Sequence, residues 1–301
     1  MRVTVLVNPA ARSGAHTDDA ARVADRLRAN GADTTIARGG SAAESSALIR
    51  AAVEEGADAL VVAGGDGTVR LAVQELAGTE VPLGIIPAGT GNGFAEALGL
   101  EGHGGEEVAD LVAAGTTRVV DLARVTNTDG STTHYASVLA SGFDSRVNDR
   151  ANAMRWPRGA SKYTLAILVE FLTLRGIPFE VDLTLADGSV ERIDGELVMA
   201  TIGNTSTYGD GIRICPDADP ADGLLDVTLV RPAGRLRLLR LMPRAYKGTH
   251  TTSPEVTTRR VTSVRLASPG VTAYADGDPI GVLPLTIEVA PRALTVFAPT
   301  P

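Results

Sequence analysis

Val61-Val62-Ala63-Gly64-Gly65-Asp66-Gly67-Thr68-Val69-Arg70 is the segment from which the rest of the chain can be interpreted. The apolar run 59–63 predicts a buried strand, and the glycines after it predict a sharp turn. Apolar residues at 69, 72, 73 and 76 then predict the inner face of a helix that Thr68 caps. Such a turn directs backbone N–H groups and a positive helix dipole beyond the sheet edge, which suits a phosphate.

One carboxylate, Asp66, lies among these glycines. It would repel a bare anion, so we expect a metal ion or a transferable proton at the same place. The alternative interpretation is an ordinary tight turn between a strand and a helix. Three glycines, an acid and a threonine within five positions favour a functional loop.

Two further loops follow predicted strands in the first part of the chain. Asn8-Pro9 follows the strand 3–7, and Gly89-Thr90-Gly91-Asn92 follows the strand 81–86. Strand and helix alternate up to about residue 124, which predicts a parallel sheet covered on both faces. Because ligands of such sheets bind beyond the carboxyl ends of the strands, we expect the three loops to share one crevice.

The pattern changes at about residue 125. Phe179–Leu185 alternates with period two, and further short strands are separated by Gly, Asp and Pro turns. This predicts a mainly antiparallel β-sandwich as a second domain. The expected boundaries are 1–124 for an α/β domain, completed by a returning tail at 290–301, and 125–289 for the β-rich domain.

The composition narrows the class of protein. The 301 residues carry a net charge of −8 and 44% hydrophobic residues, as is typical of a soluble globular protein of two domains. The acidic balance disfavours nucleic-acid binding. A single cysteine, Cys215, fits a reducing compartment, and no run approaches the ~20 apolar residues of a membrane span. We therefore expect a cytoplasmic protein.

Three common nucleotide and hydrolase motifs do not occur in the chain. No Gly-Lys-Ser/Thr follows either glycine loop, no Gly-x-Gly-x-x-Gly follows the first strand, and no Gly-x-Ser-x-Gly occurs. A P-loop enzyme, a standard dinucleotide-dependent dehydrogenase and an α/β-hydrolase are therefore disfavoured. The four histidines are scattered and disfavour a zinc site.

Five segments together resemble the diacylglycerol kinase catalytic-domain superfamily, which includes bacterial diacylglycerol kinases and the sphingosine and ceramide kinases. They cover nearly the whole chain in the family's order. The segments are Asn8-Pro9, Gly64–Thr68, Gly89–Asn92, the acidic turn 216–227 and Ala275-Asp276-Gly277-Asp278. The resemblance implies a fold like that of NAD kinases and diacylglycerol kinases, with 1–124 binding the nucleotide and 125–289 binding the lipid.

The resemblance also implies ATP and Mg²⁺. It gives Asp276 as the proton acceptor for the lipid hydroxyl, with Asp66 and Asp121 as further acids of the catalytic crevice. It gives Asp222 as a ligand of a bracing Mg²⁺, helped by groups at Asp219 and Leu224. The residues it places around the nucleotide are Asn8, Pro9, Gly64, Gly65, Asp66, Gly67, Thr68, Gly89, Thr90, Gly91 and Asn92.

Four positions depart from the family pattern. Gly93 stands where many relatives have Asp, Arg70-Leu71 replaces the usual Asn-Glu, and Asp278 replaces Glu.

Residues 231–253 contain no acid, and six basic residues there alternate with leucines. A basic, leucine-rich helix can lie on anionic lipid, so we expect contact with the inner face of the membrane. The alternative is an amphipathic helix packed on its own domain with a solvated basic face.

The leading hypothesis is an ATP-dependent kinase that phosphorylates a lipid primary hydroxyl, with diacylglycerol as substrate and phosphatidic acid as product. The alternatives are a kinase of sphingoid or other lipid alcohols, an enzyme resembling NAD kinase, and a nucleotide-binding regulator without catalysis. The sequence leaves the oligomeric state open, a homodimer included.

Overall fold

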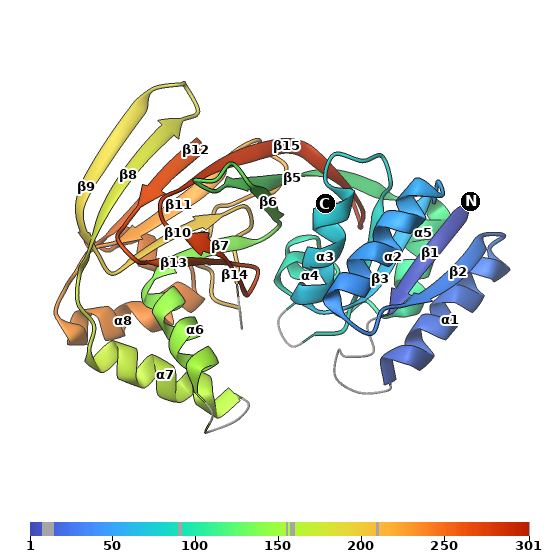
Figure 1. Cartoon of the computed structure of the whole chain (residues 1–301), viewed down its shortest axis with the longest axis horizontal. Helices are drawn as coiled ribbons and strands as arrows, with labels where there is room; N and C mark the ends of the chain where they lie inside the picture. The colour runs from blue at the N-terminus through green and yellow to red at the C-terminus, as the bar shows by residue number, and fades with distance from the viewer. Residues whose placement is uncertain (8–14, 90–91, 155, 157–159, 209–210, 301) are drawn as a thin grey trace.

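The computed structural model describes residues 1–7, 15–89, 92–154, 156, 160–208 and 211–300. They form two lobes, which are joined by a sheet of 15 strands (Figure 1). The N-terminal lobe is α/β with parallel strands, and the C-terminal lobe is a mainly antiparallel β-sandwich. The fold class expected from the sequence is confirmed.

Strands of the N-terminal lobe run parallel in the order β4-β3-β1-β2. Every residue of β3 is buried, as expected for a strand covered on both faces. The strands are β1 (Arg2–Val7), β2 (Asp33–Arg38), β3 (Ala59–Gly64) and β4 (Leu83–Pro87). The helices are α1 (Ala15–Ala29), α2 (Ala42–Glu54), α3 (Asp66–Leu76), α4 (Gly93–Ala97) and α5 (Gly105–Ala114).

The start of α3 differs from the sequence-based expectation. Gly65, not Thr68, is the N-cap, and no side chain caps the helix. Thr68 instead lies buried in the first turn, against Gly64, where a Cβ would overlap its hydroxyl. The prediction of a Thr68 cap is wrong because the bare Gly64 backbone leaves room for Thr68 inside the first turn, and the helix begins three residues earlier than expected.

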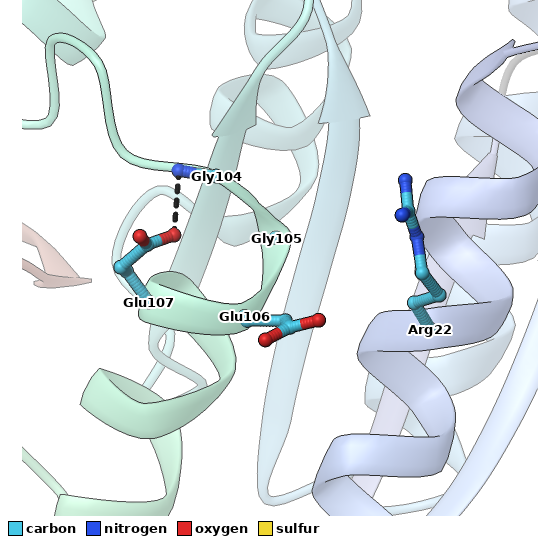
Figure 2. A pocket seen from close by; sticks show the side chains of 5 residues that line it. All are labelled: Arg22, Gly104, Gly105, Glu106 and Glu107. Carbon is cyan, nitrogen blue, oxygen red and sulfur yellow. Dashed lines mark hydrogen bonds between the residues drawn. The ribbon is translucent and has the colours of Figure 1, made fainter.

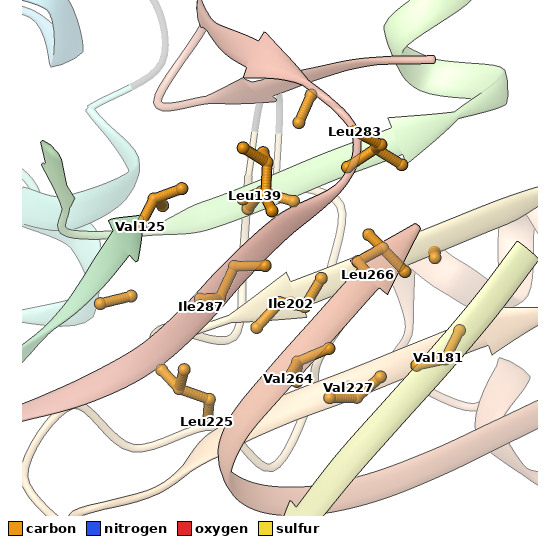
Figure 3. Close-up of a cluster of buried hydrophobic side chains, with 14 of the residues drawn as sticks. Val125, Leu139, Val181, Ile202, Leu225, Val227, Val264, Leu266, Leu283 and Ile287 are labelled. Atoms are coloured by element: carbon orange, nitrogen blue, oxygen red, sulfur yellow. The ribbon is translucent and has the colours of Figure 1, made fainter. Parts of the chain in front are cut away.

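The C-terminal lobe buries its own apolar core between antiparallel strands. Figure 3 shows part of this core, where Leu225 and Val227 of β11 lie near Val264 and Leu266 of β12. The strands are β5 (Thr117–Thr126), β6 (Thr132–Tyr135), β7 (Val138–Gly142), β8 (Ile177–Leu185), β9 (Val190–Leu197), β10 (Met199–Gly203), β11 (Leu225–Val230), β12 (Val256–Ala267), β13 (Thr272–Ala275), β14 (Asp278–Val282) and β15 (Leu285–Phe297).

Three helices lie together on one side of this lobe, at the lower left of Figure 1. They are α6 (Phe143–Ala153), α7 (Ala160–Leu172) and α8 (Arg235–Tyr246), and a 3₁₀ turn at His250–Thr252 contacts α8. The sequence predicted α8 but not α6, whose mostly polar residues carry little apolar periodicity.

Strand β15 runs through both lobes (Figure 1). Its first residues pair with β12, most of its length pairs with β5 in two stretches separated by a register shift, and Val296 pairs in parallel with Leu83 of β4. The end of the chain is therefore part of the N-terminal sheet.

A shallow hollow between α1 and α5 carries none of the expected site residues. Figure 2 shows Arg22 on one side and Glu106 on the other, with the Glu107 carboxylate accepting a hydrogen bond of 2.9 Å from the Gly104 N–H. Two carboxylates at this helix start would repel a phosphate, so the hollow is not a nucleotide site.

Candidate active site

The turns after β3 and β4 meet at the carboxyl edge of the parallel sheet. A Cβ on Gly65 would lie 2.8 Å from the Gly89 Cα, so the two backbones can approach only because both residues are glycine. The Ala88 N–H also donates to the Gly64 carbonyl at 3.0 Å. The two glycine loops therefore lie side by side.

Asn92 and Asp66 fix the second loop against the first. The Asn92 side chain accepts from the Gly89 N–H at 2.9 Å and donates to the Gly89 carbonyl at 2.8 Å. Asn92 adopts a left-handed conformation with φ of 53°, which asparagine tolerates. The Gly93 N–H then donates to the Asp66 carboxylate at 2.9 Å.

Asp66 is the first residue of α3 and is partly buried. Burial raises the pKa of its carboxyl above the ordinary value, and backbone N–H donors around Gly93 oppose that rise. Gly93 is one of the positions at which the sequence departs from the pattern of the family that it resembles. In this chain Asp66 accepts the backbone N–H of that position.

Asp276 occupies the turn between β13 and β14, with φ of 48°. Its carboxylate accepts two backbone hydrogen bonds, from Ala136 N–H at 2.9 Å and Ser137 N–H at 3.0 Å. Burial raises its pKa and the nearby charge of Asp66 raises it further, while the two amides oppose the rise. Asp66 and Asp276, 210 positions apart in the chain, are thus brought together from the two lobes.

Asp121 is a buried residue of β5. Its buried carboxylate accepts from the Gly223 N–H and the Arg292 N–H, both at 2.7 Å. Its backbone carbonyl accepts from Asn204 Nδ2, which also donates to the carbonyl of Ala136. Asp121 therefore holds the acidic turn in place, and it is linked to the Asp276 loop through Asn204.

The acidic turn presents several carboxylates and one guanidinium. Asp222 accepts from the Leu224 N–H at 2.9 Å and forms an ion pair with Arg260, which also lies 3.7 Å from Asp226. Burial raises the pKa of Asp226 to about 6, and the charge of Asp222 adds to that rise. The Asp219 carboxylate accepts from the Ala221 N–H at 3.0 Å.

Some expected site residues lie outside the part that the structure describes. These are Asn8, Pro9, Thr90 and Gly91. Gly67 is exposed at the first turn of α3, and Thr68 is buried behind it.

An apolar cavity of about 380 Å³ lies in the C-terminal lobe, which the sequence did not predict. Helices α6, α7 and α8 and residues of β10 and β11 line it, mostly with aliphatic and aromatic side chains. The polar residues of its wall include Asp144, Tyr208 and His250. No local pattern announces such a cavity, because its wall comes from segments more than 100 residues apart.

Asp144, Tyr208 and one ring nitrogen of His250 are hydrogen-bonded, whereas His250 Nδ1 is buried without a hydrogen-bond partner among the described residues. Tyr208 Oη donates to Asp144 at 2.6 Å, and burial raises the pKa of Asp144 to about 6. His250 Nε2 lies 3.1 Å from the Ile214 carbonyl, and burial lowers the pKa of His250. Both groups therefore favour their neutral forms in a low-dielectric wall.

Comparison with known proteins gives two family matches that together span most of the chain. Residues 2–125 match the diacylglycerol kinase catalytic domain, and residues 137–298 match the YegS C-terminal NAD kinase beta sandwich-like domain. A diacylglycerol kinase of Mycobacterium tuberculosis is 45% identical over 99% of this chain and 95% of its own length. A protein of Stenotrophomonas maltophilia described as "Probable lipid kinase YegS-like" is 29% identical over 85% of this chain and 84% of its own.

A solved structure shares the fold. The crystal structure of a diacylglycerol kinase from Bacillus anthracis superposes with a TM-score of 0.72 at 21% identity, covering 99% of this chain and 97% of that one.

We predict that Asp144→Asn flattens the pH dependence of stability between about pH 4 and pH 6. The folded-state pKa of about 6 lies above the ordinary value of 3.8, so the folded protein binds this proton more tightly than the unfolded chain. The contribution of Asp144 is therefore complete below pH 4 and is lost as the pH rises through 6. The free energy of unfolding, measured by urea denaturation at steps of half a pH unit, gives this pH dependence.

The control for this experiment is Asp33→Asn, which changes an exposed carboxyl of β2. It should keep the wild-type pH profile. A profile of Asp144→Asn that matches the wild type would contradict the prediction.

Proposed function

The chain belongs to the diacylglycerol kinase catalytic-domain family and is a lipid kinase, and we propose that it transfers the γ-phosphoryl group of ATP to the primary hydroxyl of diacylglycerol. The product would be phosphatidic acid. The family implies ATP as the phosphoryl donor. The curated relative at 45% identity that bears the name diacylglycerol kinase supports this choice of lipid.

The apolar cavity is the observation that carries the lipid assignment. A volume of about 380 Å³ with an aliphatic and aromatic wall suits hydrocarbon chains and offers few partners to a nicotinamide dinucleotide. It also adjoins the proposed catalytic turn. Asp149 of α6, the helix that lines the cavity, accepts a hydrogen bond of 2.6 Å from Tyr274, two residues before Asp276.

In this proposal the paired glycine loops hold the phosphates of ATP through backbone N–H groups, and Asp276 acts as general base. The lipid hydroxyl loses its proton to the Asp276 carboxylate, and its oxygen forms a bond to the γ-phosphorus. The bond from that phosphorus to the bridging oxygen breaks, and ADP leaves. The raised pKa of Asp276 suits a group that must accept a proton.

Some features of the acidic turn favour a bound structural cation, and one does not. Asp226 has a buried carboxylate oxygen without a hydrogen-bond partner among the described residues, and the neighbouring Asp222 adds negative charge. Hard oxygen ligands of this kind suit Mg²⁺. Yet no group of three or more Asp, Glu, His or Cys side chains within the described ranges is arranged to hold a metal ion.

We therefore propose that Asp222 holds Mg²⁺ together with groups at Asp219 and Leu224, in competition with Arg260. The ion would neutralise the acidic turn that Asp121 anchors.

We predict that purified protein labels diacylglycerol from γ-labelled ATP, and that Asp276→Asn lowers kcat by at least ~100-fold, as loss of a general base does. Product identity is measured by chromatography of the chloroform-extractable fraction. Asp33→Asn, with an exposed carboxyl, should retain wild-type activity.

Other outcomes decide between the alternatives. Label in a phosphorylated sphingoid base, or in NADP, would replace diacylglycerol as the substrate. Nucleotide binding without turnover on any lipid would instead indicate a regulator. Full activity of folded Asp276→Asn would remove the general-base role.

We predict that Ala245→Phe, which places a ring in the cavity, raises KM for long-chain diacylglycerol by on the order of tenfold, since losing room for two methylenes costs about 1.6 kcal/mol. KM for a dihexanoyl substrate should change less. Ala113→Phe, on the exposed face of α5, is the control for the added ring. Equal effects on both substrates would contradict the assignment of the cavity to acyl chains.

We also propose that α7 and α8 contact the membrane. No helix among the described residues is long and apolar enough to cross a bilayer. Both helices nevertheless expose large apolar side chains to solvent, among them Leu168 and Leu172 of α7 and Leu236 and Leu239 of α8. Exposed Arg240 and Lys247 flank them with positive charge, which suits an anionic lipid surface.

The structure combines the two interpretations of the basic helix. Leu238 is buried and packs α8 onto its own lobe, while Leu236 is 62% exposed. Arg237 forms an ion pair with the buried Glu255, so its charge also serves the lobe.

We predict that Leu236→Ser with Leu239→Ser reduces partitioning onto anionic vesicles by on the order of tenfold, because two exposed leucines can no longer insert into the lipid interface. Co-sedimentation measures it, and Arg240→Glu should weaken binding only to anionic vesicles. Val119→Ser with Val190→Ser removes two exposed valines elsewhere and should bind as the wild type does. Unchanged co-sedimentation of the leucine variant would contradict the proposal.

A further inference from the structure

Helix α3 carries a polar face that the proposed chemistry has not used. Asp66, Arg70 and Gln74 are spaced four residues apart and so lie on one face. The opposite face is buried in the core of the N-terminal lobe and consists of Val69, Ala72, Val73 and Leu76. The apolar face fixes the helix to its own lobe, and the polar face is directed to the other lobe.

Gln74 binds strand β6, at the start of the C-terminal lobe. Its Oε1 accepts from Thr133 Oγ1 and from the His134 N–H, both at 2.9 Å, and its Nε2 donates to the His134 carbonyl. The chain continues from His134 to Ala136 and Ser137, whose N–H groups hold the Asp276 carboxylate. Gln74 therefore anchors the segment that donates to Asp276.

Arg70 binds the other segment that carries Asp276. Its Nε lies 2.7 Å from Asp278 Oδ2, and the side chains are 24% and 45% exposed. Asp278 is the first residue of β14 and follows Asp276 by two positions. Helix α3 is thus attached both to the turn that carries Asp276 and to the segment that holds its carboxylate.

From this arrangement we infer that Arg70 and Asp278 are a positioning pair for phosphoryl transfer. Their ion pair fixes the β13–β14 turn against α3, and it thereby sets the distance between Asp276 and the glycine loop at Asp66. The inference rests on the proposed function, and it assigns neither residue a contact with ATP or lipid.

An ion pair of this kind can affect the reaction rate much more than it affects the free energy of unfolding. A half-exposed ion pair adds little to the free energy of unfolding, because water screens it and two long side chains lose freedom. A small displacement of a reacting group, in contrast, can cost a large factor in rate. Loss of the pair should therefore appear in kcat and hardly in the unfolding temperature.

The test is a double-mutant cycle with Arg70→Gln, Asp278→Asn and the combined variant, assayed for diacylglycerol phosphorylation. Arg70→Gln should lower kcat by about tenfold through misalignment, with KM for ATP changed less than about twofold. The combined variant should be no slower than the slower single variant, since the two residues act through one contact. Arg70→Lys keeps the charge and should recover part of the loss.

The matched control lies on the same helix. Arg50 and Glu75 form an ion pair of 3.0 Å between α2 and α3, inside the N-terminal lobe. Arg50→Gln and Glu75→Gln should leave kcat unchanged. Losses at Arg70 and Asp278 that multiply in the combined variant, or unchanged kcat in Arg70→Gln, would overturn the inference.

A second measurement needs no substrate. Hydrogen exchange at the amides of Ala136, Ser137 and residues 276–282 should accelerate in Arg70→Gln and not in Arg50→Gln, because the turn loses an attachment. If the wild type phosphorylates no lipid, the proposed function is wrong. The exchange measurement still shows whether the Arg70–Asp278 ion pair holds the turn in place. Unchanged exchange in Arg70→Gln would overturn the pair even in an active kinase.

Discussion

The relative placement of the two lobes depends on strand β15. One backbone segment hydrogen-bonds to β12 in the C-terminal lobe and reaches β4 in the N-terminal lobe. Its ladder with β5 extends over nearly its whole length, so both lobes share one sheet. A sheet of this kind cannot slide by one residue without turning its core side chains outward, and this fixes which loops of the two lobes face each other.

Within that frame, two acids from different lobes are placed close together, which costs electrostatic energy. Burial and mutual charge raise the pKa of Asp276, and burial raises that of Asp66. Backbone amides at Ala136, Ser137 and Gly93 offset part of the cost. Such a balance raises the pKa of both carboxyls, and raised pKa values recur at sites where protons are transferred.

The proposed lipid site differs from the proposed catalytic site because helices form most of its wall. Helices α6, α7 and α8 enclose an apolar cavity, and the exposed leucines of α7 and α8 lie on the same helices as its wall. Helix α6 joins this wall to the turn that carries Asp276 through a hydrogen bond between Asp149 and Tyr274. In the proposed reaction, a lipid bound in the cavity would therefore lie in the same lobe as Asp276, the acid proposed as general base.

Local sequence determined the elements and the loops. The apolar runs at β1, β3 and β4 and the glycines at 64, 65 and 89 were sufficient to predict a parallel sheet with convergent turns, because burial and backbone freedom are properties of short segments. The sequence misplaced the start of α3, since Thr68 packs against Gly64 instead of capping. Tertiary structure alone decided that Asp121 anchors the acidic turn, that Arg70 meets Asp278 and that three helices enclose a cavity. Each of these contacts joins residues that are far apart in the chain. The packing of the sheet and helices brings such residues together, and the sequence of a short segment does not determine that packing.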